Sequence, residues 1–187
     1  MNDLEILNQC FEPDFENGIL YFKERPREHF INQGGYTRHL KQIGKIAGST
    51  CISLKDNEPR YYREIVIYVK GSKFRRYLHR SIYMMYHNII LPSTQLIDHV
   101  DGNGLNNSIN NLRLCTRAQN SWNSKRGTTR SMTGYKNVYR KNEKEWDVRI
   151  TKLGKLYSFG SYDTIEEANE VACRERARLF GEFANDA

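Results

Sequence analysis

The stretch from residue 95 to residue 124 limits what this chain can fold into. Residues 95–100 have the composition of a short strand and run into a long, asparagine-rich loop of turn-forming residues. Residues 112–115 alternate in polarity like a second strand, and Thr116 is a typical N-cap for a helix that starts at Arg117. A strand–loop–strand–helix (ββα) unit of about 30 residues has too little apolar core to be stable alone. It must therefore pack against neighbouring segments.

The segment in front of the ββα unit supplies such neighbours. Residues 62–69 are rich in β-branched and aromatic side chains, residues 70–73 form a turn, and residues 74–78 form the second arm of a hairpin. Residues 79–87 have the apolar spacing of a helix, with Ile82, Met85 and Tyr86 on one face. A β-hairpin and a helix are therefore expected immediately before the ββα unit.

Residues 1–59 carry the weakest pattern. A short helix is expected over residues 4–11, and beyond it glycines and a charged turn at residues 55–59 separate short extended pieces. This region is expected to be an accessory region of irregular β-structure, and the sequence assigns it no role.

The C-terminal part predicts a second small domain. Three strand candidates, at residues 135–140, 145–151 and 155–162, precede a helix that ends near Gly181. Thr164 and Glu167 form a capping-box pattern at the start of that helix. Strand alternation places three apolar side chains on the face toward the helix, namely Trp146, Val148 and Ile150.

These patterns together predict an α+β fold in four parts. The expected parts are an accessory region over residues 1–59, a hairpin–helix–ββα domain over residues 60–124, a basic linker over residues 125–133, and a three-stranded sheet with one helix over residues 134–187.

Positive charge is concentrated in the middle of the chain. Residues 60–133 contain 12 basic and three acidic residues, residues 1–59 contain seven and nine, and residues 134–187 contain ten of each. The formal net charge of the 187 residues is +7. Such a concentration is the electrostatic footprint of a protein that binds a phosphate backbone, although a solvated basic surface would have the same composition.

Several classes of protein are disfavoured by the sequence. The longest apolar run, residues 65–69, is far too short for a membrane span, and the N-terminus has no signal-peptide pattern. The four cysteines are far apart and form no C-x-x-C pair, which disfavours a cysteine-based zinc site and a disulfide framework. We expect a soluble, cytoplasmic protein with no membrane partner and no small-molecule cofactor.

Four polar residues of the ββα unit form a spaced set. Asp98 and His99 end the first strand, Asn111 follows 12 residues after His99, and Asn120 follows 21 residues after it. The Asp98 carboxylate and the Asn120 amide oxygen are hard ligands, which suit one Mg²⁺ or Mn²⁺ ion better than zinc. An imidazole can serve as a general base near neutral pH. The alternative is that Asp98 and His99 only make local hydrogen bonds.

With its neighbours, this set resembles the HNH endonucleases of the phage and homing type. The matching residues are 78–80, 98–103, 106–107, 110–113 and Asn120, and the resemblance covers residues 60–124. It implies a ββα-metal nuclease that hydrolyses DNA phosphodiesters with one divalent cation. If the chain is phage- or intron-encoded, the resemblance also implies that it acts in the cytoplasm of a bacterial host. It also implies that Asn111 holds the loop and orients the His99 ring. His79 is expected to be a structural, hydrogen-bonded histidine, and Asn107 a loop-packing residue.

Residues 134–183 resemble an AP2 DNA-binding domain. The matching segments are residues 134–138, 146–150, 159–164 and 166–168. The resemblance implies a sheet surface that enters a major groove. The expected DNA-binding residues of this surface are Lys136, Tyr139, Lys141, Arg149 and Thr151. Arg113 and the linker residues Lys125, Arg126 and Arg130 are expected to contact the DNA backbone.

The sequence thus predicts a metal-dependent endonuclease acting on double-stranded DNA as a monomer or weak dimer, by nicking or by double-strand cleavage. In that prediction His99 and Asn111 are catalytic, and Asp98 and Asn120 hold the metal. One alternative is a sequence-specific DNA-binding regulator with an inactive HNH unit. Another is an RNA-binding or RNA-cutting protein, although the expected aromatic platform for single strands is missing from the sequence pattern.

Overall fold

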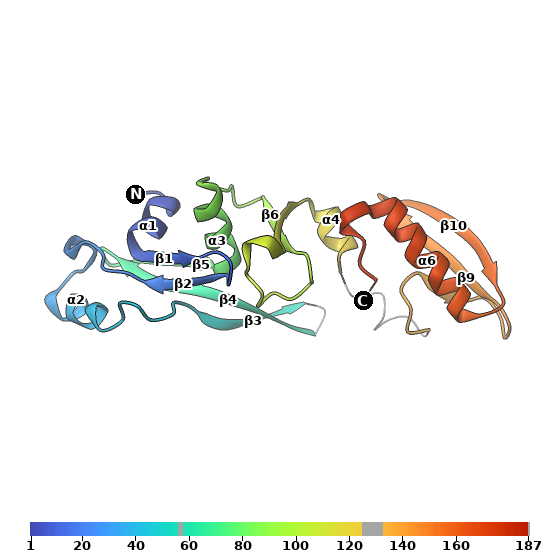
Figure 1. Ribbon diagram of the computed structural model, residues 1–187, viewed down its shortest axis with the longest axis horizontal. Helices are drawn as coiled ribbons and strands as arrows, with labels where there is room; N and C mark the ends of the chain where they lie inside the picture. The colour runs from blue at the N-terminus through green and yellow to red at the C-terminus, as the bar shows by residue number, and fades with distance from the viewer. Residues whose placement is uncertain (56–57, 125–132, 187) are drawn as a thin grey trace. The chain divides into compact units, whose positions relative to one another are not determined.

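The fold consists of two units. The computed structural model describes residues 1–55, 58–124 and 133–186. The units are Met1–Leu114 and Cys115–Ala187 (Figure 1). Among the helices of the described residues, none combines the length and the apolar character that a membrane span requires.

A three-stranded antiparallel sheet and one helix frame the first unit. The sheet has the order β3 (Ser49–Lys55), β4 (Glu58–Val69), β5 (Ser72–Tyr77), and helix α3 (Leu78–His87) follows β5 directly. The expected hairpin and helix are therefore confirmed. Strand β3 lies between Gly48 and the charged turn, where a short piece of irregular β-structure was expected, and the structure shows it as a full member of the sheet.

The N-terminal region shares its core with this frame. It contains α1 (Asp3–Cys10), the hairpin β1 (Phe11–Asp14) and β2 (Ile19–Phe22), η1 (Arg27–His29) and α2 (Gln33–Leu40). Its buried side chains belong to the same cluster as Ile65, Leu78 and Ile82; they include Leu7, Phe11 and Leu20. Residues 1–59 are therefore not separated from the following residues by a boundary between two cores.

Helix α3 is enclosed on several sides. It contacts α1, β2, β4 and β5, and Ile82, Tyr83 and Met84 are all buried. The expected apolar face is therefore only partly correct. Tyr86 is 52% exposed, because the helix ends one residue later and the chain turns away at Asn88 with a positive φ.

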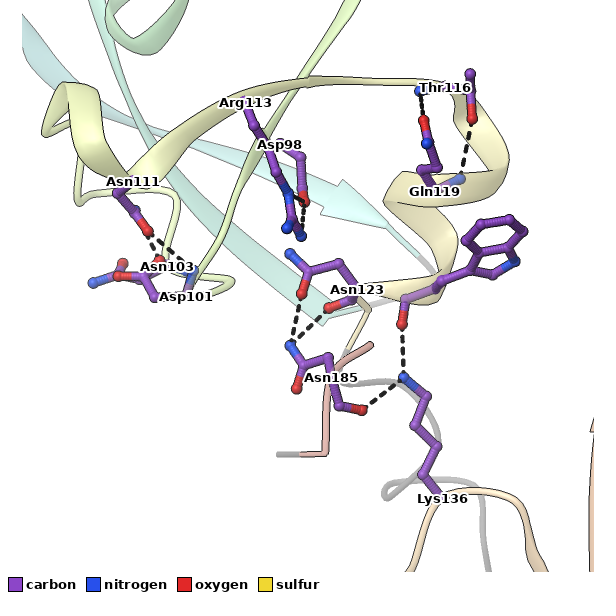
Figure 2. A network of polar contacts seen from close by, with 11 residues as sticks. Asp98, Asp101, Asn103, Asn111, Arg113, Thr116, Gln119, Asn123, Lys136 and Asn185 are labelled. Atoms are coloured by element: carbon purple, nitrogen blue, oxygen red, sulfur yellow. Dashed lines mark hydrogen bonds and ion pairs between the residues drawn. The ribbon is translucent and has the colours of Figure 1, made fainter. Parts of the chain in front are cut away.

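The chain then forms the two strands and the loop of the expected ββα unit. Strand β6 (Leu96–His99) pairs with β7 (Leu112–Cys115), and η2 (Ile109–Asn111) precedes β7. Helix α4 (Arg117–Trp122) starts at a capping box in which Thr116 and Gln119 bond reciprocally (Figure 2). The order of the elements is as expected, but α4 belongs to the second unit.

The second unit is a three-stranded antiparallel sheet with a helix on one face. The strands are β8 (Val138–Arg140), β9 (Trp146–Lys152) and β10 (Lys155–Tyr162), in the order β10-β9-β8, and α6 (Ile165–Phe180) leads into η3 (Gly181–Phe183). Val138 and Val148 pack with Ala168 and Ala172 of α6, and Trp146 lies against this cluster. The three strands and the helix expected here are confirmed, as is the inward position of Trp146.

A buried arginine ties the end of the chain to the rest of the second unit. Arg176 of α6 is 1% exposed, and its Nε donates to Asp186 Oδ1 at 2.7 Å while its Nη1 donates to the carbonyl of Lys136. The Lys136 ammonium donates to the carbonyls of Trp122 and Ser124, each at 2.9 Å, and of Asn185 at 3.2 Å. Figure 2 shows Lys136 reaching the carbonyls of Trp122 and Asn185. Helix α4 is thereby joined to the C-terminal residues.

Replacement of Arg176 should destabilise the second unit. Arg176→Leu leaves the buried Lys136 carbonyl without its donor, so we expect a loss of about 1–3 kcal/mol of unfolding free energy. Both tryptophans, Trp122 and Trp146, lie in this unit, so urea denaturation followed by tryptophan fluorescence reports its unfolding. The matched control is Arg178→Leu, because the Arg178 side chain is 64% exposed and its ion pair with Glu175 should contribute little. Equal effects of both variants would contradict the prediction.

Candidate functional site

The expected catalytic pair lies at the end of β6. Asp98 and His99 are 5% and 6% exposed. The strand continues its pairing one residue further, since the Val100 amide donates to the Asn111 carbonyl at 2.9 Å. Both side chains are therefore held in a protein environment rather than in bulk solvent.

The Asp98 carboxylate is held by an arginine of the neighbouring strand. Arg113 of β7 donates to Asp98 Oδ2 from Nε at 3.1 Å and from Nη2 at 2.9 Å (Figure 2). The Arg113 side chain is 14% exposed. Arg113 was expected to contact a DNA phosphate, and the structure instead places its guanidinium against Asp98. Two charge-assisted hydrogen bonds from one guanidinium hold the Asp98 carboxylate in a fixed direction.

The loop after His99 is organised by Asp101 and Asn111. Asn111 Oδ1 accepts from the Asp101 amide at 3.0 Å, and Asn111 Nδ2 donates to Asp101 Oδ1 at 2.9 Å and to the Asn106 carbonyl at 2.8 Å (Figure 2). Asp101 also accepts from the Asn103 amide and from Asn106 Nδ2. Burial opposes the charge of Asp101, but these hydrogen bonds outweigh burial and lower its pKa. Asn111 therefore fixes the shape of the loop.

Asn107, which was expected only to pack in the loop, contacts the imidazole. His99 Nε2 lies 3.2 Å from Asn107 Oδ1, and Asn107 is 1% exposed. The expected ring partner, Asn111, is bonded to Asp101 and Asn106 instead. No sequence signal separates Asn107 from the adjacent Asn106, since the difference between them is burial in the fold.

The rings of His79, from α3, and Tyr62, from β4, pack against the His99 imidazole. The ring centroid of His79 lies 5.0 Å from that of His99 at an interplanar angle of 74°, and the Tyr62 ring lies 6.3 Å from His99. His79 also stacks on Tyr77. His79 was expected to be hydrogen-bonded, but its buried Nδ1 has no partner among the residues that the structure describes. Its contacts are ring packing.

Burial disfavours the charged form of four histidines in the first unit and so lowers the pKa of each. It lowers the pKa of His29, His39 and His99, and lowers that of His79 to about 3 with help from the nearby His99 and Arg80. Hydrogen bonding to Asn107 and the charges of Asp101 and Asp98 partly offset this decrease at His99.

The stability of the first unit should therefore fall in mild acid. The unfolded chain binds protons below pH about 6.5 that the folded histidines do not bind, so unfolding becomes easier as pH falls from there toward 3. Each such histidine adds up to about 1.4 kcal/mol per pH unit. His79→Leu should weaken the pH dependence, whereas the same change at the exposed His87 should leave it intact. Urea unfolding followed by circular dichroism measures this, and an unchanged slope in His79→Leu would refute it.

The donor set of the site fits a hard divalent ion. Within the described residues, no three His, Cys, Asp or Glu side chains cluster in a way that could hold a metal. A single fixed carboxylate, Asp98, suits an ion that keeps most of its ligands as water and phosphate oxygens, as Mg²⁺ does. Asn120 lies in the first turn of α4, in the other unit. Its expected pairing with Asp98 on one ion stays a prediction.

A second polar surface lies on the sheet of the C-terminal unit, opposite α6. The Arg149 guanidinium lies over the Tyr139 ring, 4.8 Å from its centroid, and its Nη2 is 3.8 Å from Asp147 Oδ2. Lys141 Nζ donates to Ser161 Oγ at 3.0 Å, and Ser161 Oγ donates to Asp147 Oδ1. Tyr139 and Thr151 are exposed. Four of the expected DNA-binding residues therefore gather here; they are Tyr139, Lys141, Arg149 and Thr151.

The remaining expected DNA contacts are placed elsewhere. The Lys136 ammonium is bonded to three carbonyls of its own unit, and burial together with Arg176 lowers its pKa to about 8. It does not belong to the exposed sheet surface. Lys125, Arg126 and Arg130 lie outside the described residues.

Comparison with known proteins identifies a domain of this chain. A model of the HNH endonuclease family matches residues 76–122, which include Asp98, His99, Asn111 and Asn120. Protein 3.8 of Escherichia phage T7 is 41% identical over 96 residues, which make up 50% of this chain and 77% of the phage protein. Residues 76–122 of this chain form an HNH endonuclease domain.

One further relative and one solved structure are also similar to this chain. Uncharacterized HNH endonuclease L560 of Acanthamoeba polyphaga mimivirus is 35% identical to this HNH endonuclease over 107 residues, 57% of this chain and 54% of the viral protein. The chain therefore spans about half of the mimivirus protein. A solved structure described as DNA binding and cleavage by the HNH homing endonuclease I-HmuI aligns with a TM-score of 0.39 and 18% identity, over 95% of this chain and 85% of the other.

The HNH endonuclease domain decides the class of activity. It identifies this protein as a nuclease and therefore as an enzyme. The alternative of a DNA-binding regulator with an inactive HNH unit is not favoured, because Asp98, His99, Asn111 and Asn120 are all present within the matched residues.

Proposed function

We propose that this HNH endonuclease hydrolyses phosphodiester bonds of double-stranded DNA with one divalent ion, Mg²⁺ or Mn²⁺, in each site. The Asp98–His99 pair carries the proposal, since it combines a fixed, buried carboxylate with an adjacent neutral imidazole. The expected placement of the enzyme, in a bacterial host cytoplasm as a monomer or weak dimer, stays a prediction.

The ion would be held by Asp98, with Asn120 as the second protein ligand that the family resemblance implies. When bound, it would stabilise negative charge on the scissile phosphate and on the leaving 3′ oxygen. Arg113 keeps Asp98 in one orientation through two hydrogen bonds to the same oxygen, Oδ2. This arrangement directs the carboxylate before any ion binds.

His99 acts as the general base in this proposal. A neutral imidazole can take a proton from the attacking water, whereas an imidazolium cannot. Burial lowers the pKa of His99 and so keeps its ring in the neutral form at physiological pH. Asn111 acts on His99 indirectly, because its hydrogen bonds to Asp101 fix the loop that begins after His99.

Charge supports DNA as the substrate. Residues 60–133 carry 12 basic and three acidic residues, and two of the three acids are Asp98 and Asp101 of the site and its loop. A basic surface around a nuclease site attracts a phosphate backbone and accelerates encounter with it.

We further propose that the second unit is an AP2-like domain that helps to select the site. Its exposed sheet surface carries Tyr139, Lys141, Arg149 and Thr151, and the Arg149 guanidinium is held between the Tyr139 ring and Asp147. A guanidinium restrained in this way loses little conformational entropy when it binds a base edge or a phosphate.

Cleavage of DNA tests the proposed activity. Supercoiled plasmid and a library of randomised sites are incubated with Mg²⁺, with Mn²⁺ and with chelator, and conversion to open-circle or linear DNA is measured. We expect metal-dependent cleavage that falls by about 10²–10⁴-fold in His99→Ala, because that is the usual contribution of a general base. His87→Ala, at an exposed histidine, should keep full activity. Equal activity of His99→Ala and the parent protein would rule out the proposed role of His99.

Binding of DNA tests the proposed sheet surface. Arg149→Ala should weaken binding of the selected site by about 1–3 kcal/mol without abolishing cleavage chemistry, because Arg149 lies outside the Asp98–His99 site. The comparison uses Arg178→Ala, which removes the same charge from the helix on the other side of the sheet. Equal losses in both variants would indicate a general charge effect, and no loss in either would contradict the proposed surface.

A further inference from the structure

The Asn107 side chain contacts Nε2 of His99, and its own orientation is fixed. Its Nδ2 donates to the Leu105 carbonyl at 3.1 Å, so its Oδ1 is the atom directed at His99 Nε2, 3.2 Å away. An amide oxygen can only accept a hydrogen bond. The contact therefore favours the imidazole tautomer with its proton on Nε2, in which Nδ1 is the basic nitrogen.

The N-terminal hairpin supports the backbone on which Asn107 stands. Gly18, in the β1–β2 turn, has a φ of +64°, and a Cβ at this position would lie closer than 3.0 Å to the backbone of Asn107 and Ser108. The Ile109 amide donates to the Phe15 carbonyl of the same turn at 2.9 Å. Only glycine permits so close an approach of two backbones together with this φ.

The opposite end of the loop is supported by the sheet. A Cβ at Gly104 would lie closer than 3.0 Å to the Tyr61 carbonyl of β4 and to the Tyr62 ring. The loop that carries Asn107 is thus confined between the β1–β2 turn and strand β4, and it has little room to move away from His99.

From these contacts we propose that Asn107 is a positioning residue that sets the tautomer and direction of the His99 imidazole, and that the β1–β2 hairpin keeps Asn107 in place. This gives the N-terminal region a part in catalysis without any contact with DNA. The proposal rests on the role of His99 as the base. Its proton transfer is from the attacking water to His99 Nδ1, with Nε2–H remaining bonded to Asn107.

The tautomer can be measured without DNA. In the full-length protein labelled with ¹⁵N, two-bond ¹H–¹⁵N correlations distinguish a protonated from an unprotonated ring nitrogen, and His99→Gln identifies the His99 signals. We expect the parent protein to show the proton on Nε2. Asn107→Leu should redistribute the proton between the two nitrogens and lower kcat about 10- to 100-fold with KM nearly unchanged, as loss of an orienting partner usually does.

Asn110→Leu is the matched control, because it makes the same change at an exposed position of the same loop. It should alter neither the His99 signals nor kcat. Unchanged His99 signals in Asn107→Leu, or changed signals with full kcat, would overturn the proposal. Absence of cleavage by the parent protein would count against the proposed function, whereas the imidazole signals would still decide the role of Asn107 on the ring.

The hairpin is tested by a pair of glycine variants. Gly18→Ala should displace the loop, change the His99 signals and lower kcat in the same direction as Asn107→Leu. Gly44→Ala carries the same backbone strain at a φ of +77°, but a Cβ there meets nothing within 4 Å. It should therefore cost stability without changing His99. If Gly18→Ala and Gly44→Ala both leave the His99 signals unchanged, the hairpin does not support Asn107.

Discussion

The carboxylate of Asp101 is the group on which the arrangement of the first unit's site depends. Residues 101–108 belong to no strand or helix, so side chains and a few turn hydrogen bonds must supply partners for their backbone groups. The Asp101 carboxylate accepts hydrogen bonds from Asn103, Asn106 and Asn111, and the Asp101 amide donates to Asn111 Oδ1. This closed set of hydrogen bonds fixes the path of the loop between β6 and β7. The direction of the Asn107 amide, and with it the environment of His99, follows from that path.

The two neighbouring residues Asp98 and His99 are buried in different surroundings. Asp98 is buried beside a cation, since Arg113 donates to its Oδ2 twice. His99 is buried against the rings of His79 and Tyr62, and burial lowers the pKa of its imidazole. The end of β6 thus places a carboxylate held by a guanidinium next to an imidazole that burial favours in its neutral form. This difference in surroundings suits the separate roles of metal ligand and base that we propose for the two residues.

The elements with strong local patterns were predictable from the sequence, and those stabilised by distant contacts were not. The hairpin of β4 and β5, the strands around the loop and the C-terminal sheet have β-branched runs or clear caps, and they are observed. Strand β3 and the β1–β2 hairpin have weak patterns, because their stability comes from pairing and from the shared core. In the site, spacing identified His99 and its neighbours. Three other features were not predictable from spacing: the contact of Asn107 with His99, the pairing of Arg113 with Asp98, and the enclosure of the Lys136 ammonium. They depend on burial and on contacts between residues far apart in the chain.

Helix α4 carries a residue of the family motif, yet it is built into the C-terminal unit. Trp122 stacks on Phe180 with ring centroids 4.7 Å apart, and Asn185 Nδ2 donates to the carbonyl and side-chain oxygens of Asn123. The Lys136 ammonium bonds the end of the same helix. The second structural unit therefore starts before Thr116 and not at the basic stretch that follows α4. A chimaera joined after Trp122 would separate the helix from the residues that hold it, whereas one joined ahead of the Thr116 cap would transfer helix, sheet and their contacts together.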